Sequence, residues 1–219
     1  MILSSKNQQL TRLNSSKTPL SASHPRPLVL ASTSAYRAQL LSRLLVPFIT
    51  VAPASDETAV PGEVCRATAV RLAAVKAAAG AARSGLTDAL VIGSDQVADL
   101  DGVALGKPLS VENAFSQLRS MRARKVVFHT ALALLDIRSG RLQQAVVATV
   151  VTMRDYPDAA IEFYLSRENA LDCAGSAKSE GLGAALIESM TSDDPTALVG
   201  LPLLSLVSML QREGFEVLS

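Results

Sequence analysis

The run Ala89-Leu-Val-Ile-Gly-Ser-Asp-Gln-Val-Ala-Asp-Leu100 (ALVIGSDQVADL) is the most apolar strand-like stretch of the sequence. Its composition, and the Asp101-Gly102 turn signal behind it, predict a buried strand over residues 89–100. Asp95 sets one carboxylate directly after the apolar part of this run. Open α/β sheets gather ligand groups where a strand ends and the chain leaves the packed layer, so we expect Asp95 at such an edge. A turn cap or the start of a bulge is the alternative reading of Asp95.

Strand-like and helical patterns alternate on both sides of this run, which predicts an α/β fold. Before it we expect strands at 27–32 and 48–51 and helices at 35–45 and 63–83. After it we expect a helix at 109–121 behind Ser110, a hairpin of strands at 125–137 and 141–153, a helix after Pro157, an irregular segment at 170–183 and a last helix at 202–212.

Length and composition restrict the class of protein. The 219 residues are 48% hydrophobic, enough to bury a sizeable core. Lys and Arg total 21 against 20 acidic residues, so no concentrated basic field marks a nucleic-acid or membrane partner, and a small-molecule partner is expected. Cys65 and Cys173 are far apart in the sequence, so neither a disulfide framework nor a cysteine zinc site is expected, which fits an intracellular setting. The longest uncharged apolar stretch, 197–210, is too short for a membrane span.

Residues 1–26 differ in character from the rest. They carry basic but no acidic side chains and many Ser, Thr and Asn residues. This composition predicts a disordered N-terminal extension ahead of one domain at 27–219. A transit peptide would share the acid-poor, serine-rich composition.

Several short stretches offer groups that bind phosphate or a cation. Ser32, Ser34 and Arg37 surround an expected helix start, where free N–H groups, hydroxyls and a guanidinium would form a phosphate pocket, although hydroxyl residues are also ordinary helix caps. Glu57 lies on a polar loop and with Asp95 could supply oxygen ligands to a hard cation. Solvation is the alternative for loop acids and for Lys76 on its helix, whereas Lys107 is fixed between a glycine and a proline.

The stretch Cys-Ala-Gly-Ser-Ala-Lys-Ser-Glu-Gly (173–181) combines small residues with Lys178 and Glu180. Backbone of this kind can approach a ligand closely, so we expect a binding segment here rather than a flexible surface loop. The sequence contains no GxxxxGK[ST], HExxH, GxSxG or GxGxxG motif, and two isolated histidines are too few for a histidine metal site.

Seven ordered stretches together resemble the Maf family of nucleoside triphosphate pyrophosphatases, from about Leu28 to the C-terminus. They are LASTSAYRAQLL, DET, RLAAVKA, VIGSDQV, GKPLSVENA, CAGSAKSEGLG and LVGLPL. The resemblance implies an elongated α/β fold with a twisted mixed sheet, flanking helices and a cleft between two lobes. It also implies a cytoplasmic, metal-dependent enzyme that uses Mg²⁺ or Mn²⁺ and releases pyrophosphate from a nucleoside triphosphate; a homodimer is compatible with it.

Two details resemble the branch of this family that hydrolyses 7-methyl-GTP: SDQ at 94–96 where ADT is commoner, and KSEG at 178–181. Carried over by position, the proton acceptor falls on Asp95. The phosphate and metal region falls on Ser32, Arg37, Glu57, Lys76, Lys107 and Lys178, and the positions linked to base choice fall on Tyr36, Gln96 and Glu180. Ala35 replaces the usual proline and Tyr36 the tryptophan typical of this branch, so these two departures concern the expected pocket.

The residue types also suit a methylated guanine. N7-methylation makes guanine cationic, so the ring of Tyr36 could stack on it with a gain of roughly 0.5–2 kcal/mol. Glu180 could accept hydrogen bonds from N1–H and the exocyclic amine. Asp95 could act as general base or as metal ligand. A dTTP/UTP pyrophosphatase of the other branch and a nucleotide-binding regulator of septum formation are the alternative functions.

Overall fold

The computed structural model describes residues 26–58 and 60–218. The predicted extension at 1–26 therefore lies outside the described residues except for Arg26. The Arg26 guanidinium pairs with Asp88 at 2.7 Å and with Asp136. Within the described ranges, no helix has the length and apolar character needed to cross a bilayer.

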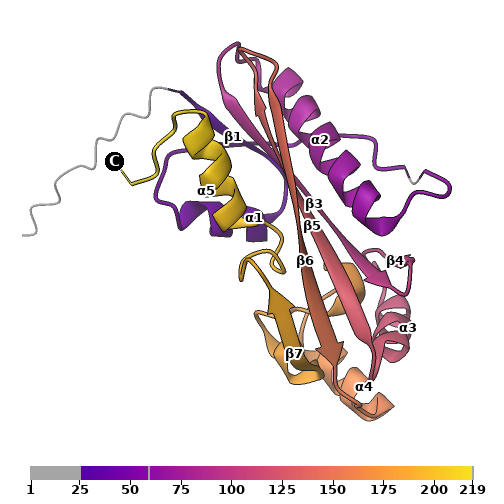
Figure 1. The fold of residues 1–219 in the computed structure, drawn as a ribbon. Coiled ribbons are helices and arrows are strands. Elements are labelled where there is room, and N and C mark those ends of the chain that lie inside the picture. The colour runs from indigo at the N-terminus through magenta and orange to yellow at the C-terminus, as the bar shows by residue number, and fades with distance from the viewer. Residues whose placement is uncertain (1–25, 59, 219) are drawn as a thin grey trace, which may run out of the picture.

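A mixed sheet of seven strands runs through the molecule in the order β2-β1-β3-β5-β6-β7, with β4 paired to β3 (Figure 1). β1 pairs in parallel with β2 and β3, and the other pairs are antiparallel. The strands are β1 (Leu28–Ala31), β2 (Ile49–Val51), β3 (Leu90–Leu100), β4 (Val103–Leu105), β5 (Lys125–Asp136), β6 (Leu142–Met153) and β7 (Ile187–Ser192). The predicted α/β class and mixed sheet are confirmed.

The helices flank this elongated sheet (Figure 1). They are α1 (Ala35–Ser42), α2 (Cys65–Ser84), α3 (Val111–Met121), α4 (Asp158–Arg167) and α5 (Leu203–Arg212). All the predicted helices are present. The stretch expected to be irregular contains the short 3-10 turn η1 (Ala174–Ser176) and leads into η2 (Leu182–Leu186).

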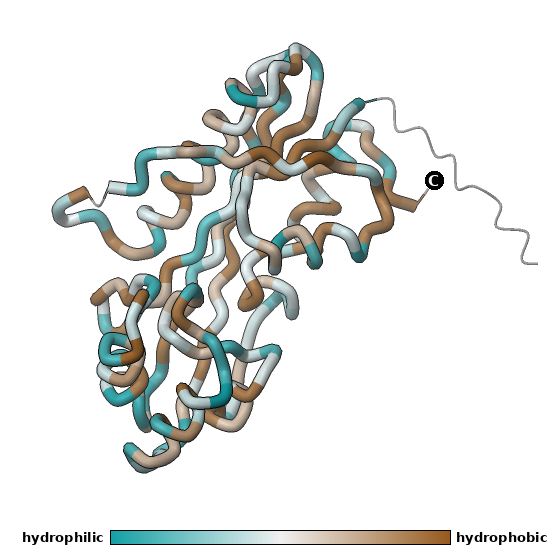
Figure 2. Tube along the Cα trace, turned by 180° about the vertical axis from the view of Figure 1, so that it is seen from behind, coloured by the Kyte–Doolittle hydropathy of each residue, from teal (hydrophilic) through white to brown (hydrophobic). Residues whose placement is uncertain are grey.

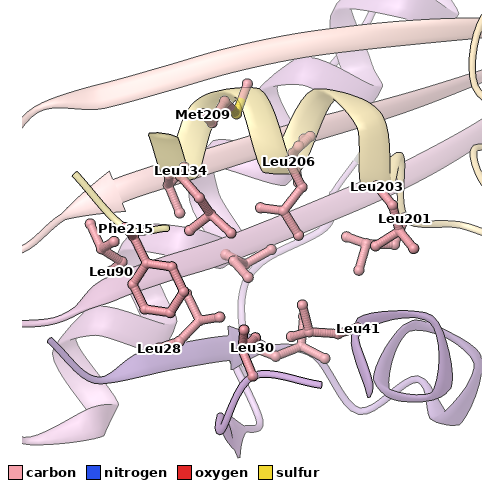
Figure 3. Close-up of a cluster of buried hydrophobic side chains, with 14 of the residues drawn as sticks. Leu28, Leu30, Leu41, Leu90, Leu134, Leu201, Leu203, Leu206, Met209 and Phe215 are labelled. Atoms are coloured by element: carbon pink, nitrogen blue, oxygen red, sulfur yellow. The ribbon is translucent and has the colours of Figure 1, made fainter. Parts of the chain in front are cut away.

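Two hydrophobic clusters occupy the same face of the sheet at its two ends. The upper cluster joins β1, α1 and α5 to Leu90 and Ile92 of β3 (Figure 3). The lower cluster joins α3 and α4 to Ala98 and Leu100 of the same strand. All four are even-numbered, and alternate residues of a strand share a face. Between the clusters this face carries polar residues. Figure 2 shows hydrophilic colours interrupting the hydrophobic ones along the middle of the long strands.

Helix α2 covers the opposite face of the sheet, and two glycines let it approach closely. A Cβ at Gly93 would lie 2.2 Å from the carbonyl oxygen of Ala73 and 2.6 Å from the amide nitrogen of Ala77. A Cβ at Gly80 would lie 2.3 Å from that of Ala31. Because both contacts are closer than any side chain allows, glycine at these positions fixes α2 directly against β1 and β3.

Candidate active site

Asp95 lies in the middle of β3 and not at its C-terminal end, so the expected strand-end position is wrong. Pairing along one edge of β3 is instead interrupted beside Asp95. β5 pairs with the other edge over residues 90–99. On the broken edge β1 pairs only as far as Ile92, and β4 begins only at Ala98. Asp95 therefore faces the carboxyl end of the neighbouring parallel strand β1, where the chain turns into α1.

Lys76 of α2 joins the two acids predicted to bind metal. Its Nζ lies 2.6 Å from Asp95 Oδ1 and 3.1 Å from Glu57 Oε1. The side chains of Lys76 and Asp95 are 8% and 9% exposed, whereas that of Glu57 is 55% exposed. Burial raises the pKa of Asp95, and the neighbouring Lys76 ammonium and Arg37 guanidinium oppose the rise. A buried carboxylate in this position can accept a proton or bind a metal ion.

The hydroxyl-rich turn after β1 brings Arg37 to the same place. Ser34 caps α1 by accepting the Arg37 amide at 3.4 Å, so the alternative reading of this serine as a helix cap holds. Arg37 donates from Nε to the carbonyl of Gly200 at 2.9 Å and from Nη1 to Ser32 Oγ at 3.5 Å. Burial lowers the pKa of Arg37, and the charges of Asp95 and Glu57 oppose this.

The charges of this cluster balance: Lys76 and Arg37 carry two positive charges, and Asp95 and Glu57 carry two negative ones. A triphosphate would add negative charge that these four side chains do not neutralise. Among residues 26–58 and 60–218, no three His, Cys, Asp or Glu side chains form a metal site by themselves. Mg²⁺ is usually held by one or two carboxylates together with substrate phosphates, and the pair Glu57 and Asp95 fits that donor set.

A second contact joins the turn after β1 to the segment at 173–181. Lys178 Nζ lies 5.5 Å from the centroid of the Tyr36 ring and 2.9 Å from Glu168 Oε1 of the α4 C-cap. Glu168 and Tyr36 both raise the pKa of Lys178. Glu168 Oε2 also accepts the amide of Leu182 at 3.1 Å. The structure thus brings Tyr36, predicted for base choice, close to Lys178, predicted for phosphate binding, and Lys178 is held by a glutamate that the sequence analysis did not identify.

Three predicted residues lie apart from the Asp95 cluster. Lys107 is exposed on the loop between β4 and α3, and Glu180 is exposed two residues beyond Lys178. Gln96 follows Asp95 in an extended strand and so points to the opposite face of the sheet. Its Nε2 lies 2.8 Å from Thr130 Oγ1, within the polar band between the two hydrophobic clusters.

The segment before α5 was expected to matter only as part of the LVGLPL stretch, yet it supplies the Gly200 carbonyl to Arg37. Asp194 organises this segment. Its carboxylate accepts the amides of Thr196 at 2.9 Å and Leu204 at 2.8 Å. The spacing Asp-Pro-Thr is typical of an Asx turn and was the available signal for it.

The sequence is similar to known proteins over most of its length. The family model described as Maf-like protein matches residues 27–213. A protein of Thiobacillus denitrificans (strain ATCC 25259 / T1) is 57% identical over 192 residues, covering 88% of this chain and 94% of its own. One of Paraburkholderia xenovorans (strain LB400) is 55% identical over 199 residues, covering 90% and 97%. Both relatives are named 7-methyl-GTP pyrophosphatase.

Proposed function

The chain belongs to the Maf family, and on that premise we propose that it is a nucleoside triphosphate pyrophosphatase that hydrolyses 7-methyl-GTP to 7-methyl-GMP and pyrophosphate. One observation carries the proposal: relatives that are about 55% identical to this chain over nearly its whole length share the name 7-methyl-GTP pyrophosphatase. The cluster around Asp95 supports it, because a carboxylate, an ammonium and a guanidinium meet beside the end of β1.

The chemistry assigned to these residues is an attack of water on the α-phosphorus. Asp95 accepts the proton of the attacking water, for which a carboxylate with a raised pKa is suited. The bond from the α-phosphorus to its bridging oxygen breaks, and the electron pair leaves with pyrophosphate. Lys76 and Arg37 neutralise the charge that develops on this leaving group.

A divalent cation, Mg²⁺ or Mn²⁺, is part of the proposal. Held by Glu57, Asp95 and phosphate oxygens, it would polarise the phosphoryl group and offset the charge of the triphosphate. Ser32, Ser34, Lys107 and Lys178 complete the proposed phosphate-binding set.

The base is proposed to lie against Tyr36 and Glu180. A cationic 7-methylguanine gains roughly 0.5–2 kcal/mol from an aromatic face. The exposed Glu180 carboxylate, which receives one hydrogen bond from Ser179 Oγ at 3.3 Å, can accept the N1–H and amine of the guanine edge.

The test is pyrophosphate release from a panel of normal and modified nucleoside triphosphates, with Mg²⁺, with Mn²⁺ and with a chelator, for the wild type and Asp95→Asn. We expect a preference for 7-methyl-GTP, loss of turnover in the chelator and a fall of about 10²–10⁴-fold in the variant. A preference for dTTP or UTP would overturn the assignment of the base, and wild-type turnover by Asp95→Asn would overturn the role of Asp95.

A further inference from the structure

A band of buried polar side chains crosses the sheet on the face opposite Asp95. It consists of Ser94 of β3 and Thr130 of β5 together with the partly buried Gln96 of β3, and it separates the upper from the lower hydrophobic cluster. Ser94 and Thr130 are fully buried. Hydroxyls and amides in such a place need hydrogen-bond partners, because a buried polar group without one is costly.

All three side chains of this band donate to carbonyl groups of one short segment, residues 197–200, called here the return loop. Ser94 Oγ lies 2.9 Å from the Gly200 oxygen and 2.8 Å from the Ala131 oxygen of β5, so its one proton is shared between two carbonyls. Thr130 Oγ1 lies 2.9 Å from the Ala197 oxygen. Gln96 Nε2 lies 3.1 Å from the Ala197 oxygen and 2.9 Å from that of Leu198. The side chains of two strands thus hold the return loop through its own backbone.

The last carbonyl of the return loop connects the band to the site. The Gly200 oxygen accepts hydrogen bonds from Arg37 Nε and from Ser94 Oγ, each at 2.9 Å, and Ser94 shares its proton with the Ala131 oxygen. A second hydrogen bond of the Arg37 guanidinium, to Ser32 Oγ at 3.5 Å, is long and therefore weak. Gly200 adopts a φ of +119°, a conformation that side chains rarely allow, so the carbonyl direction depends on glycine at this position.

We propose that Ser94 and Gln96 are positioning residues, which fix the return loop so that the Gly200 carbonyl orients the Arg37 guanidinium towards the phosphates. The proposal rests on the proposed function only in giving Arg37 a phosphate to bind. It assigns Gln96 to the return loop and not to the base. It also gives a physical role to the two residues that flank Asp95 in the Ser-Asp-Gln stretch, both of which point away from it.

The first test measures the affinity for pyrophosphate by calorimetry in a double-mutant cycle. Ser94→Ala should weaken binding roughly 5- to 30-fold in the wild-type background. In an Arg37→Ala background the same change should cost less than about twofold, because the group through which Ser94 acts is gone. Thr149→Val is the matched control: Thr149 is also a buried hydroxyl of the sheet, but it pairs with Ser192 Oγ at 2.9 Å. It should change affinity less than about twofold in both backgrounds.

Equal losses from Ser94→Ala in the two backgrounds, or no loss from a folded Ser94→Ala protein, would overturn the proposal. The cycle uses pyrophosphate alone, so its result stands apart from turnover. A wild type that hydrolyses no nucleoside triphosphate would refute the proposed function, while a non-additive cycle would still support the positioning role.

The second test separates positioning from base reading at Gln96. Gln96→Glu keeps the shape of the side chain but replaces the donating NH₂ by an oxygen that faces the carbonyls of the return loop. We expect kcat/KM for 7-methyl-GTP and for GTP to fall by the same factor, roughly 5- to 30-fold. A change in the ratio of the two values would show that Gln96 acts on the base and would refute its assignment to the return loop.

Discussion

Removing one member of the Lys76–Asp95 pair should affect stability very differently from removing the other. Lys76→Met leaves the Asp95 carboxylate buried without its closest cation. Asp95→Asn leaves Lys76 with Glu57 at 3.1 Å, and Glu57 is 55% exposed, so the ammonium keeps a hydrated partner. The lysine variant should therefore be the less stable of the two.

The magnitudes follow from the burial of the pair. Breaking a buried pair by removing one partner costs about 3–5 kcal/mol, and we take the lower end because Arg37 still offsets the charge of Asp95. At about 2–4 °C per kcal/mol for a domain of this size, Lys76→Met should lower Tm by about 6–12 °C. Asp95→Asn replaces a charged hydrogen bond by a neutral one and should cost about 1–2 kcal/mol.

The decisive protein is the double variant Lys76→Met/Asp95→Asn. With both charges removed, its Tm should recover to within a few degrees of the wild type, since a buried ion pair adds little net stability over uncharged groups. Thermal unfolding and pyrophosphate release are measured on all four proteins, and activity should stay lost in every variant. A double variant less stable than Lys76→Met would refute this reasoning, as would one that regains turnover.

Three further changes test other parts of the structure. Glu168→Gln should raise KM for 7-methyl-GTP about fivefold by releasing Lys178, with less than about 1 kcal/mol lost on unfolding; an unchanged KM would contradict this. Burial acts to raise the pKa of Asp136, but hydrogen bonds, chiefly from the Arg26 guanidinium, hold it well below its ordinary value. This carboxylate therefore stabilises the fold at neutral pH, and the contribution is lost as pH falls below about 4. In unfolding titrations Asp136→Asn should be less stable than the wild type by about 1–3 kcal/mol at pH 7, and its free energy of unfolding should change less with pH in acid. Gly93→Ala should cost about 3 kcal/mol or prevent folding, because the new Cβ meets the backbone of α2, whereas Gly106→Ala has open space and should stay within about 0.5 kcal/mol in the same assay.

Periodicity and turn residues were sufficient to predict the order of the long elements. The leucine spacing of α1 predicts a helix, and the apolar run of β3 predicts a strand. The short strands β4 and β7 were not predicted; they form by pairing with strands already in place. The turn at Asp101-Gly102 was predicted correctly, but the strand that follows it was not predicted.

The site shows the same division between local and tertiary information. Ser34 and Arg37 were recognisable because helix caps and phosphate-binding turns are local. The mid-strand position of Asp95 was not recognisable, because it depends on where β1 stops pairing with β3. Glu168 and the Gly200 carbonyl were missed for a related reason: each gains its role from a partner distant in the chain, Lys178 in the first case and Arg37 in the second.

The three long strands limit how far the two ends of the molecule can move relative to each other. β3, β5 and β6 contain 11, 12 and 12 residues and run without interruption from the upper to the lower cluster, about 35–40 Å. Their continuous pairing gives the molecule a rigid frame, and Asp95 lies at the middle of one of these strands. A hinge between the lobes would have to break this continuous ladder. If the proposed phosphate and base sites are right, the spacing between them is set by strand register, and only the loops at the ends of the strands are left to adjust to different bases.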